Sequence, residues 1–191
     1  IYYGQNVISK NMIIADRRLL LNGNAFILGV SGGGKSFAAK GEIINQILAS
    51  EADVIIIDPE REYSALVKEL GGEIINISAT SKSHINAMDM NKEYGDGANP
   101  VILKSEFIMS LCEQLIGGEN LGAKQKSIID RCTASVYRAY QQSGYTGTVP
   151  TLRDFREELL RQDEPEAREI ALAIELFTNG SLNTFAKPTN V

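Results

Sequence analysis

The chain has 191 residues, of which 43% are hydrophobic and 23% are charged, as is typical of a globular domain rather than a disordered or fibrous protein. Its 24 acidic and 19 basic side chains leave a net charge of −5, which excludes a chain-wide basic surface for nucleic acid but not a local one. A single histidine and two cysteines without a Cys-x-x-Cys motif argue against a structural zinc site and a Ser-His-Asp triad.

The first half of the chain predicts strands that alternate with helices. Two short strands are expected first, at residues 1–4 and 11–16. Three apolar runs without polar alternation then predict strands buried on both faces of a sheet, at residues 25–30, 53–58 and 73–77. Helical segments separate these runs, at residues 36–49 and 63–70. The order strand, helix, strand, helix, strand predicts an α/β fold with a parallel sheet and right-handed crossovers.

The second half of the chain predicts an all-helical insert. Residues 78–100 are polar and loop-like, and helical periodicity follows at residues 101–116, 125–141, 152–160 and 165–177. Thr151, with Asp154 three residues later, is close to a capping box for the third of these helices. Cys112 and Cys132 fall in helical sequence and are expected to be buried thiols rather than a disulfide.

Only three convincing core strands precede the helical region, whereas an open parallel sheet usually has about 5–6. We therefore expect a sheet that is incomplete at the C-terminal side and a chain that is part of a longer protein. The expected division is an N-terminal part of the core at residues 1–95, an insert at 96–180, and the start of a return to the core at 181–191.

One motif carries the chemistry. Residues 29–36 read Gly-Val-Ser-Gly-Gly-Gly-Lys-Ser and match G-x-x-x-x-G-K-[ST] at every position, with an apolar strand before and an amphipathic helix after. Glycines allow turn geometries in which backbone N–H groups converge on phosphate oxygens, and the following helix directs its positive end at the same anion. The predicted nucleotide-binding residues are Gly29, Val30, Ser31, Gly32, Gly33, Gly34, Lys35, Ser36 and Phe37.

Within this loop, Lys35 is expected to reach the β and γ phosphates of ATP, and the Ser36 hydroxyl to bind Mg²⁺. A glycine-rich turn without a ligand is the alternative, and the complete motif between a strand and a helix disfavours it. A dinucleotide-binding G-x-G-x-x-G loop is rejected because the glycine spacing differs and Lys35-Ser36 follow.

A second motif, Asp58-Pro59-Glu60-Arg61-Glu62-Tyr63, follows the strand at residues 53–58 and faces the ligand crevice of a parallel sheet. In one interpretation Asp58 helps to bind the metal, and Glu60 or Glu62 polarises the attacking water. In the other, the Walker B Asp-Glu pair lies beyond Val191, which we favour because the sheet is incomplete. Solvent-exposed acidic residues at the start of a helix are an equally weighted interpretation of Glu60 and Glu62.

Other polar features favour structural roles. His84 is expected to be a surface loop residue rather than a ligand. The helix at 125–141 carries basic residues, which we interpret mainly as a solvent-exposed face; contact with a phosphate chain or a neighbouring subunit is the alternative. These residues are Lys124, just before the helix, and Lys126, Arg131 and Arg138. No Asn-Lys-x-Asp pattern or Asp-x-x-Gly switch is present, which argues against a GTPase.

Together the motifs resemble those of the conjugative type IV secretion ATPases, the TraC/TrbE/CagE (VirB-type) branch of the HerA–FtsK superfamily. The resemblance rests on residues 29–43 and the acidic turn, with Lys40-x-Glu42 and Asp58-Pro59-x-x-Glu62-Tyr63 at the family's spacing. The segment Ile85-Asn86-Ala87-Met88-Asp89 and later helical stretches extend it over nearly the whole chain.

The resemblance implies a RecA-like P-loop NTPase fold with an all-helical insert, and an ATPase that uses ATP and Mg²⁺. It further implies self-association as a hexamer or smaller oligomer, other secretion-channel subunits as partners, transferred DNA or protein as a possible cargo, and a cytoplasmic place at the inner face of the bacterial membrane. It places the Walker B pair, a sensor-like Gln and a trans-acting Arg downstream, so these residues alone are expected to bind ATP without necessarily hydrolysing it. A HerA/FtsK-like DNA translocase, a nucleotide-gated scaffold and a small-molecule kinase are the alternatives.

Overall fold

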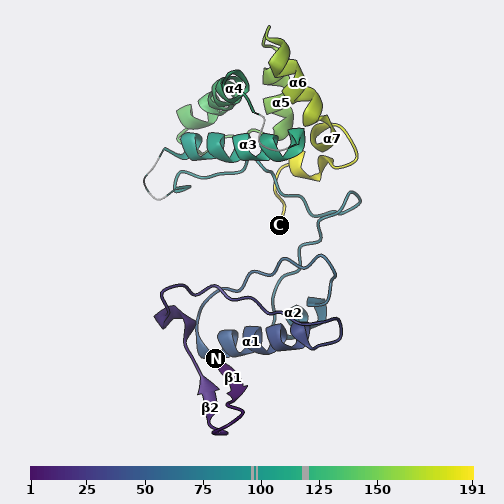
Figure 1. The fold of residues 1–191 in the computed structure, drawn as a ribbon. Helices are drawn as coiled ribbons and strands as arrows, with labels where there is room; N and C mark the ends of the chain where they lie inside the picture. Colours follow the sequence, from purple (N-terminus) through teal and green to yellow (C-terminus); the bar gives the residue numbers. More distant parts are fainter. Residues whose placement is uncertain (96, 98, 118–120) are drawn as a thin grey trace. The chain divides into compact units, whose positions relative to one another are not determined.

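The computed structural model describes residues 1–95, 97, 99–117 and 121–191, and the chain divides into two compact units, Ile1–Ile74 and Ile75–Val191 (Figure 1). The first unit carries the glycine-rich motif. The second carries most of the helices and the cluster of buried hydrophobic residues, which extends from Met88 to Ala186. Asp96, the first residue of the expected insert, lies outside the described residues.

The first unit opens with a hairpin. Strands β1 (Tyr2–Gln5) and β2 (Met12–Ile14) pair antiparallel, with Tyr2 opposite Ile14 and Gln5 opposite Met12. Both strands were expected from the sequence. A short 3-10 helix, η1 (Arg17–Leu19), follows, and the helices of this unit are α1 (Lys35–Ala49) and α2 (Ser64–Glu69). Both helices were predicted to within one residue at each end.

The predicted parallel sheet is not formed in the part of the chain that the structure describes, where the only sheet is the β1–β2 hairpin. The runs at residues 25–30, 53–58 and 73–77 carry no strand assignment. An apolar run indicates which segment tends to be extended, but a ladder also needs a neighbouring strand about 4.8 Å away in register. The sequence pattern therefore predicted the segments and not their pairing.

Burial on both faces, the second expectation for these runs, is also wrong. Phe26, Leu28, Ile55 and Ile57 are 90%, 89%, 91% and 93% exposed, respectively. The alternate residues Ala25, Ile27 and Val54 line a hollow of about 340 Å³ together with Ala39 and Ile43 of α1. Because a helix covers one side only, the residues pointing the other way stay in solvent, which explains the alternating exposure.

The second unit is helical. Its helices are α3 (Pro100–Ile116), α4 (Ala123–Gln142), α5 (Leu152–Leu160), α6 (Pro165–Ala173) and α7 (Glu175–Thr178), followed by a 3-10 helix, η2 (Asn183–Ala186). The sequence predicted α3, α4 and α5 closely. The single helix expected at residues 165–177 is divided into α6 and α7 at Ile174.

The helix boundaries follow from local chemistry. The Asn99 side chain accepts a hydrogen bond of 3.1 Å from the N–H of Val101, and Pro100 occupies the first turn of α3, where its missing N–H costs nothing. Gly117 ends α3 with φ of +100°, a conformation that disfavours side chains. At α5 the Thr151 N–H donates to Asp154 Oδ2 over 2.7 Å, which confirms the predicted capping interaction.

The core of this unit lies where α3, α4, α5 and α6 meet. Ile108, Ile129, Phe155 and Ile170, one from each helix, are fully buried there. The two cysteines are also fully buried, and both are free thiols, as expected. Burial raises the pKa of Cys112 to about 12 and that of Cys132 to about 11, so both thiols stay protonated at neutral pH.

Three of the four basic residues singled out near α4 form surface ion pairs. Lys124 pairs with Glu166 at 3.3 Å, Lys126 with Glu113 at 3.0 Å, and Arg131 with Glu164 at 2.8 Å. These pairs join α4 to α3 and to the start of α6. The solvated-face interpretation is therefore confirmed for them, and each contributes modestly, in the range of about 0–1 kcal/mol.

No helix within the described ranges combines the length and the apolar character that a bilayer span requires.

Candidate functional site

The glycine-rich loop, residues 29–34, joins the extended run at 25–30 to α1. Gly32 and Gly34 have φ of +75° and +82°, the left-handed region that glycine enters without steric cost. The Gly33 N–H donates to Val30 O over 3.1 Å, and a Cβ atom at Gly33 would lie 3.0 Å from that oxygen. The backbone therefore favours glycine at three successive turn positions, at 32 and 34 for their dihedral angles and at 33 for space.

The loop runs directly into the N-terminus of α1. Helix α1 begins at Lys35, and Gly34 at its N-cap offers no side chain to accept the first N–H groups. The first turn closes through Ala38 N–H, which donates to Gly34 O over 2.9 Å. The N–H groups of Lys35, Ser36 and Phe37 precede that bond and have no acceptor one turn back, so they are available to an anion at the positive end of the helix.

Lys35 lies over the same loop. Its Nζ atom donates hydrogen bonds of 3.0 Å to Gly29 O and 3.0 Å to Val30 O. The ammonium group is thus held beside the loop by two neutral carbonyl oxygens. A phosphate oxygen carries full charge and makes the stronger, charge-assisted hydrogen bond, so it can replace a carbonyl as the partner.

The remaining loop residues differ in exposure. Ser36 is half-buried in the first turn of α1, whereas Phe37 is 83% exposed. No cluster of three or more His, Cys, Asp or Glu side chains suited to a metal occurs among the residues that the structure describes. This donor set still fits Mg²⁺, because that ion keeps several waters and takes one protein oxygen, here the Ser36 hydroxyl, with the remainder from phosphates.

Asp58 is occupied by backbone groups. Its Oδ1 accepts from Glu62 N–H at 3.2 Å and its Oδ2 from Tyr63 N–H at 2.9 Å. These bonds, with the Tyr63 bond the largest cause, hold the pKa of the Asp58 carboxyl below its usual value. The carboxylate closes the turn that leads into α2, and its predicted metal role stays a prediction.

Glu60 and Glu62 are both exposed on this acidic turn, residues 58–63. Arg61 between them has φ of +59°, an uncommon conformation for a residue with a side chain. The turn contacts α1 through Lys40, whose Nζ lies 5.4 Å from the centre of the Tyr63 ring. The structure therefore ties the acidic turn to the helix that follows the glycine-rich loop, and the catalytic roles of both glutamates stay predictions.

An ion pair that the sequence did not indicate connects η1 with α1. Arg17 Nη2 contacts Glu42 Oε1, and both side chains line the 340 Å³ hollow between α1 and the extended runs. The sequence singled out Glu42 through its Lys40-x-Glu42 pattern but offered no signal for Arg17. A partner so far away along the chain is identified only by the tertiary structure.

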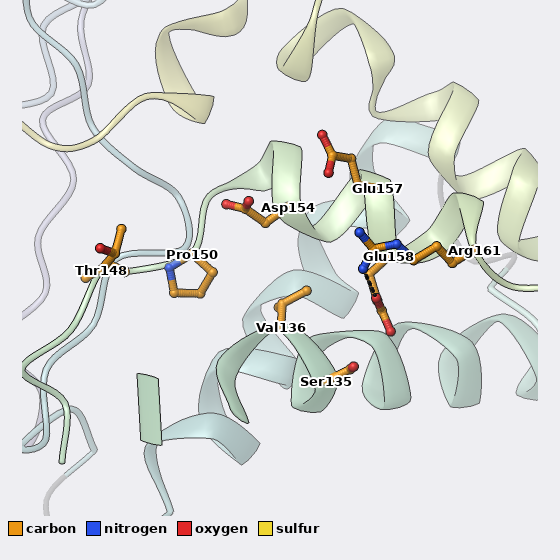
Figure 2. A pocket seen from close by; sticks show the side chains of 9 residues that line it. Ser135, Val136, Thr148, Pro150, Asp154, Glu157, Glu158 and Arg161 are labelled. Carbon is orange, nitrogen blue, oxygen red and sulfur yellow. Dashed lines mark hydrogen bonds and ion pairs between the residues drawn. The ribbon is translucent and has the colours of Figure 1, made fainter. Parts of the chain in front are cut away.

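The helical unit holds a hollow of its own, of about 370 Å³, between α4 and α5 (Figure 2). Asp154, Glu157 and Glu158 line it. Asp154 is engaged in capping α5, and Glu158 Oε2 pairs with Arg161 Nη1 at 3.2 Å. Two of its three carboxylates therefore already have partners within the chain, and we assign no ligand to this hollow.

His84 lies in a loop, where its backbone groups bind Asn190. Its N–H donates to Asn190 Oδ1 over 2.6 Å and its carbonyl oxygen accepts from Asn190 N–H over 3.2 Å. Tyr137 and Tyr140 are buried, and their hydroxyl groups donate to Met88 O and Met90 O. The expectations of a loop role for the histidine and a packing role for the tyrosines are confirmed.

Comparison with solved structures identifies chains of the same fold. The structure of VirB4 of Thermoanaerobacter pseudethanolicus matches with a TM-score of 0.75 and 24% sequence identity, over 100% of this chain and 53% of that one. The chain thus spans about half the length of the VirB4 chain that it matches. A comparison with curated proteins gave no match.

A family model covers most of the sequence. It is described as Helicase HerA, central domain, and it matches residues 19–190, which include the glycine-rich loop, the acidic turn and all the helices of the second unit. The motif at residues 29–36, its left-handed glycines and this match agree, and the chain belongs to the HerA central-domain family of P-loop ATPases.

Proposed function

We propose that this chain is the ATP-binding motor domain of a conjugative transfer or type IV secretion ATPase. The observation that carries the proposal is the loop at residues 29–34, whose left-handed glycines lead into the uncapped N-terminus of α1 beside the Lys35 ammonium. The motifs shared with the secretion ATPases and the fold shared with VirB4 support the secretion context.

In this proposal each part of the loop binds a different part of the nucleotide. The N–H groups of the loop and of Lys35 and Ser36 donate to phosphate oxygens, and Lys35 Nζ exchanges its two carbonyl partners for the β and γ phosphates. Ser36 holds Mg²⁺, which neutralises charge on the phosphates. Phe37, exposed in the same turn of α1, contacts the nucleotide beside them.

Hydrolysis is an in-line attack by water on the γ-phosphorus, which breaks the bond to the bridging oxygen of ADP and releases phosphate. Lys35 and an arginine from a neighbouring subunit stabilise the negative charge of the transition state. Glu60 and Glu62 are the candidates in this chain for orienting the water. Because two backbone amides hold Asp58, we assign it the placement of the acidic turn, with metal binding as the second possibility.

Titration calorimetry with Mg-ATP tests the binding step without requiring turnover. The Lys35→Ala variant is expected to lose binding by at least about tenfold, because a charge-assisted contact to phosphate is removed. Lys68→Ala is the matched control, since it removes the same charge from an exposed position on α2. Equal ATP affinity in wild type and Lys35→Ala, or equal losses in both variants, would refute the assignment.

A DNA translocase is the second candidate, favoured by the description of the matching family as a helicase domain. The net charge of −5 gives it no general electrostatic support. Steady-state ATP turnover of the intact protein with and without duplex DNA separates the two. Stimulation by DNA that disappears as salt is raised favours a translocase, and turnover independent of DNA favours the secretion motor.

The proposal extends to assembly and location. We expect a hexamer or smaller oligomer, contact with secretion-channel subunits, and a place on the cytoplasmic side of the bacterial membrane, with residues 1–95 as core, 96–180 as insert and 181–191 as the return. Sedimentation of the intact protein with and without Mg-ATP checks self-association. A nucleotide-gated scaffold predicts oligomers that form with ATP but negligible turnover.

A further inference from the structure

Two segments that are far apart in the sequence, one before the first helix of the helical unit and one after its last α-helix, lie side by side. The leading segment, residues 82–90, runs toward α3, and the returning segment, residues 183–190, follows α7. Asn190 joins them: its Oδ1 accepts from His84 N–H at 2.6 Å, its N–H donates to His84 O at 3.2 Å, and its Nδ2 donates to Lys82 O at 2.9 Å. One side chain and one N–H group thus bind three backbone sites more than 100 residues away.

Two further bonds continue this contact along the leading segment. Asn86 N–H donates to Thr189 Oγ1 at 3.0 Å, and Ala87 N–H donates to Phe185 O at 3.2 Å. The contact is not a regular ladder, because two of its acceptors are side-chain oxygens. It therefore depends on the identities of Thr189 and Asn190, and not on backbone pairing alone.

The leading segment is itself anchored to the helices. Asn86 is 4% exposed, its Nδ2 donates to Pro150 O at 2.9 Å, and its Oδ1 accepts from Met88 N–H at 3.0 Å. Tyr137 and Tyr140 of α4 donate to the carbonyl oxygens of Met88 and Met90. The returning segment, by contrast, ends in exposed residues at 188–190. Its end is held by the leading segment and not by burial.

We propose that the hydrogen bonds between the leading and returning segments form and break cooperatively, as one joint. The joint is a conformational device that holds together, or frees together, the two segments by which the chain enters and leaves the helical unit. Thr189 and Asn190 are the positioning residues of the joint, and Asn86 couples it to the α4–α5 connection. Because the five bonds link the same two short segments, loss of one increases the freedom of both segments and weakens the others. A displacement of either segment is therefore expected to displace the other as well.

Amide hydrogen exchange of the 191-residue chain, read residue by residue by NMR, tests this cooperativity. In Asn190→Ala the direct partner His84 must exchange faster whatever the mechanism. The joint predicts that Asn86 and Ala87, which Asn190 does not contact, also exchange about tenfold or more faster. The same three amides are expected to respond in Thr189→Val, whose direct partner is Asn86.

Two comparisons make the test decisive. Asn183→Ala alters the same returning segment at a side chain for which the described structure shows no hydrogen bond, and it is expected to leave the three amides unchanged. Amides of α4 are expected to keep wild-type protection in every variant, since Thr189 and Asn190 are exposed. Acceleration confined to the direct partner, an equal response to Asn183→Ala, or loss of protection throughout α4 would each overturn the proposal.

Discussion

Lys40 of α1 lies with its Nζ atom 5.4 Å from the centre of the Tyr63 ring, so the helix that begins in the glycine-rich loop contacts the acidic turn. Tyr63 is also the residue whose N–H is bound by Asp58. One aromatic residue therefore joins the two motifs that the sequence identified separately. Glu60 and Glu62 belong to the turn that this contact joins to α1.

The Lys40–Tyr63 contact is expected to contribute about 0.5–1 kcal/mol, as cation–π pairs near the surface do. Lys40→Met removes the charge and Tyr63→Leu removes the ring, while both keep apolar bulk. Chemical denaturation of the two single variants and the double variant gives the coupling energy. A coupling of zero would show that the two side chains are neighbours without a net attraction.

Gly34→Ala is expected to destabilise the loop by about 1–2 kcal/mol, because its φ of +82° is unfavourable for a residue with a Cβ atom. It is also expected to weaken Mg-ATP binding. Gly41→Ala is the matched control, since Gly41 lies within α1 with open space around its Cβ position, and alanine there is expected to stabilise the helix by up to about 1 kcal/mol. Thermal unfolding and calorimetry compare them, and equal changes would argue against a special backbone at Gly34.

The Asp58 turn is expected to depend on pH at its acidic end. Because the folded pKa of Asp58 lies below its ordinary value of 3.8, its carboxylate stabilises the turn fully above that value, and the stabilisation is lost as the pH falls through the folded pKa. The amide resonances of Glu62 and Tyr63, followed by NMR between neutral pH and pH about 2, are expected to shift with one midpoint below 3.8. In Asp58→Asn this transition should vanish, and a transition that persists there would belong to another carboxylate.

Tyr137→Phe is expected to destabilise the helical unit by about 1–3 kcal/mol, because it leaves the buried carbonyl oxygen of Met88 without its donor. Tyr145→Phe is the control, since the Tyr145 ring packs edge-on against Tyr140 and its hydroxyl makes no hydrogen bond within the described chain. Its effect is expected to stay within about 0.5 kcal/mol. Denaturant unfolding of both variants checks this, and equal effects would show that the Met88 bond is energetically neutral.

The helices illustrate what local patterns can predict. Helices α1 to α5 were located closely because capping residues and the 3.6-residue period are local properties of the chain. The helix expected at 165–177 was predicted as one, yet α6 ends at Ala173 and α7 begins at Glu175. Arg156 of α5 contributes there, since its Nε donates to Ala171 O at 3.1 Å and its Nη2 pairs with Glu175 at 2.7 Å. Those contacts come from another helix and leave no local pattern.

The strands and the acidic turn show the opposite case. The runs at 25–30 and 53–58 read as buried strands, but the residues facing away from α1 are exposed, because the pattern records apolar character and not what covers it. For Asp58, the sequence offered metal binding, or a Walker B pair further along the chain, and gave no sign of the two amide contacts by which Asp58 holds the turn. The pairing of Arg17 with Glu42 had no signal in the sequence.

The sequence by itself determined the glycine-rich loop and the family, because Gly32, Gly34 and Lys35 act within a few residues of one another through backbone geometry and one charge. It also determined most helices for the same reason. Only the tertiary structure decided that Lys40 contacts Tyr63 and that Asn190 hydrogen-bonds with His84. These contacts join residues far apart in the chain, and such pairs depend on how the whole chain packs rather than on any local preference.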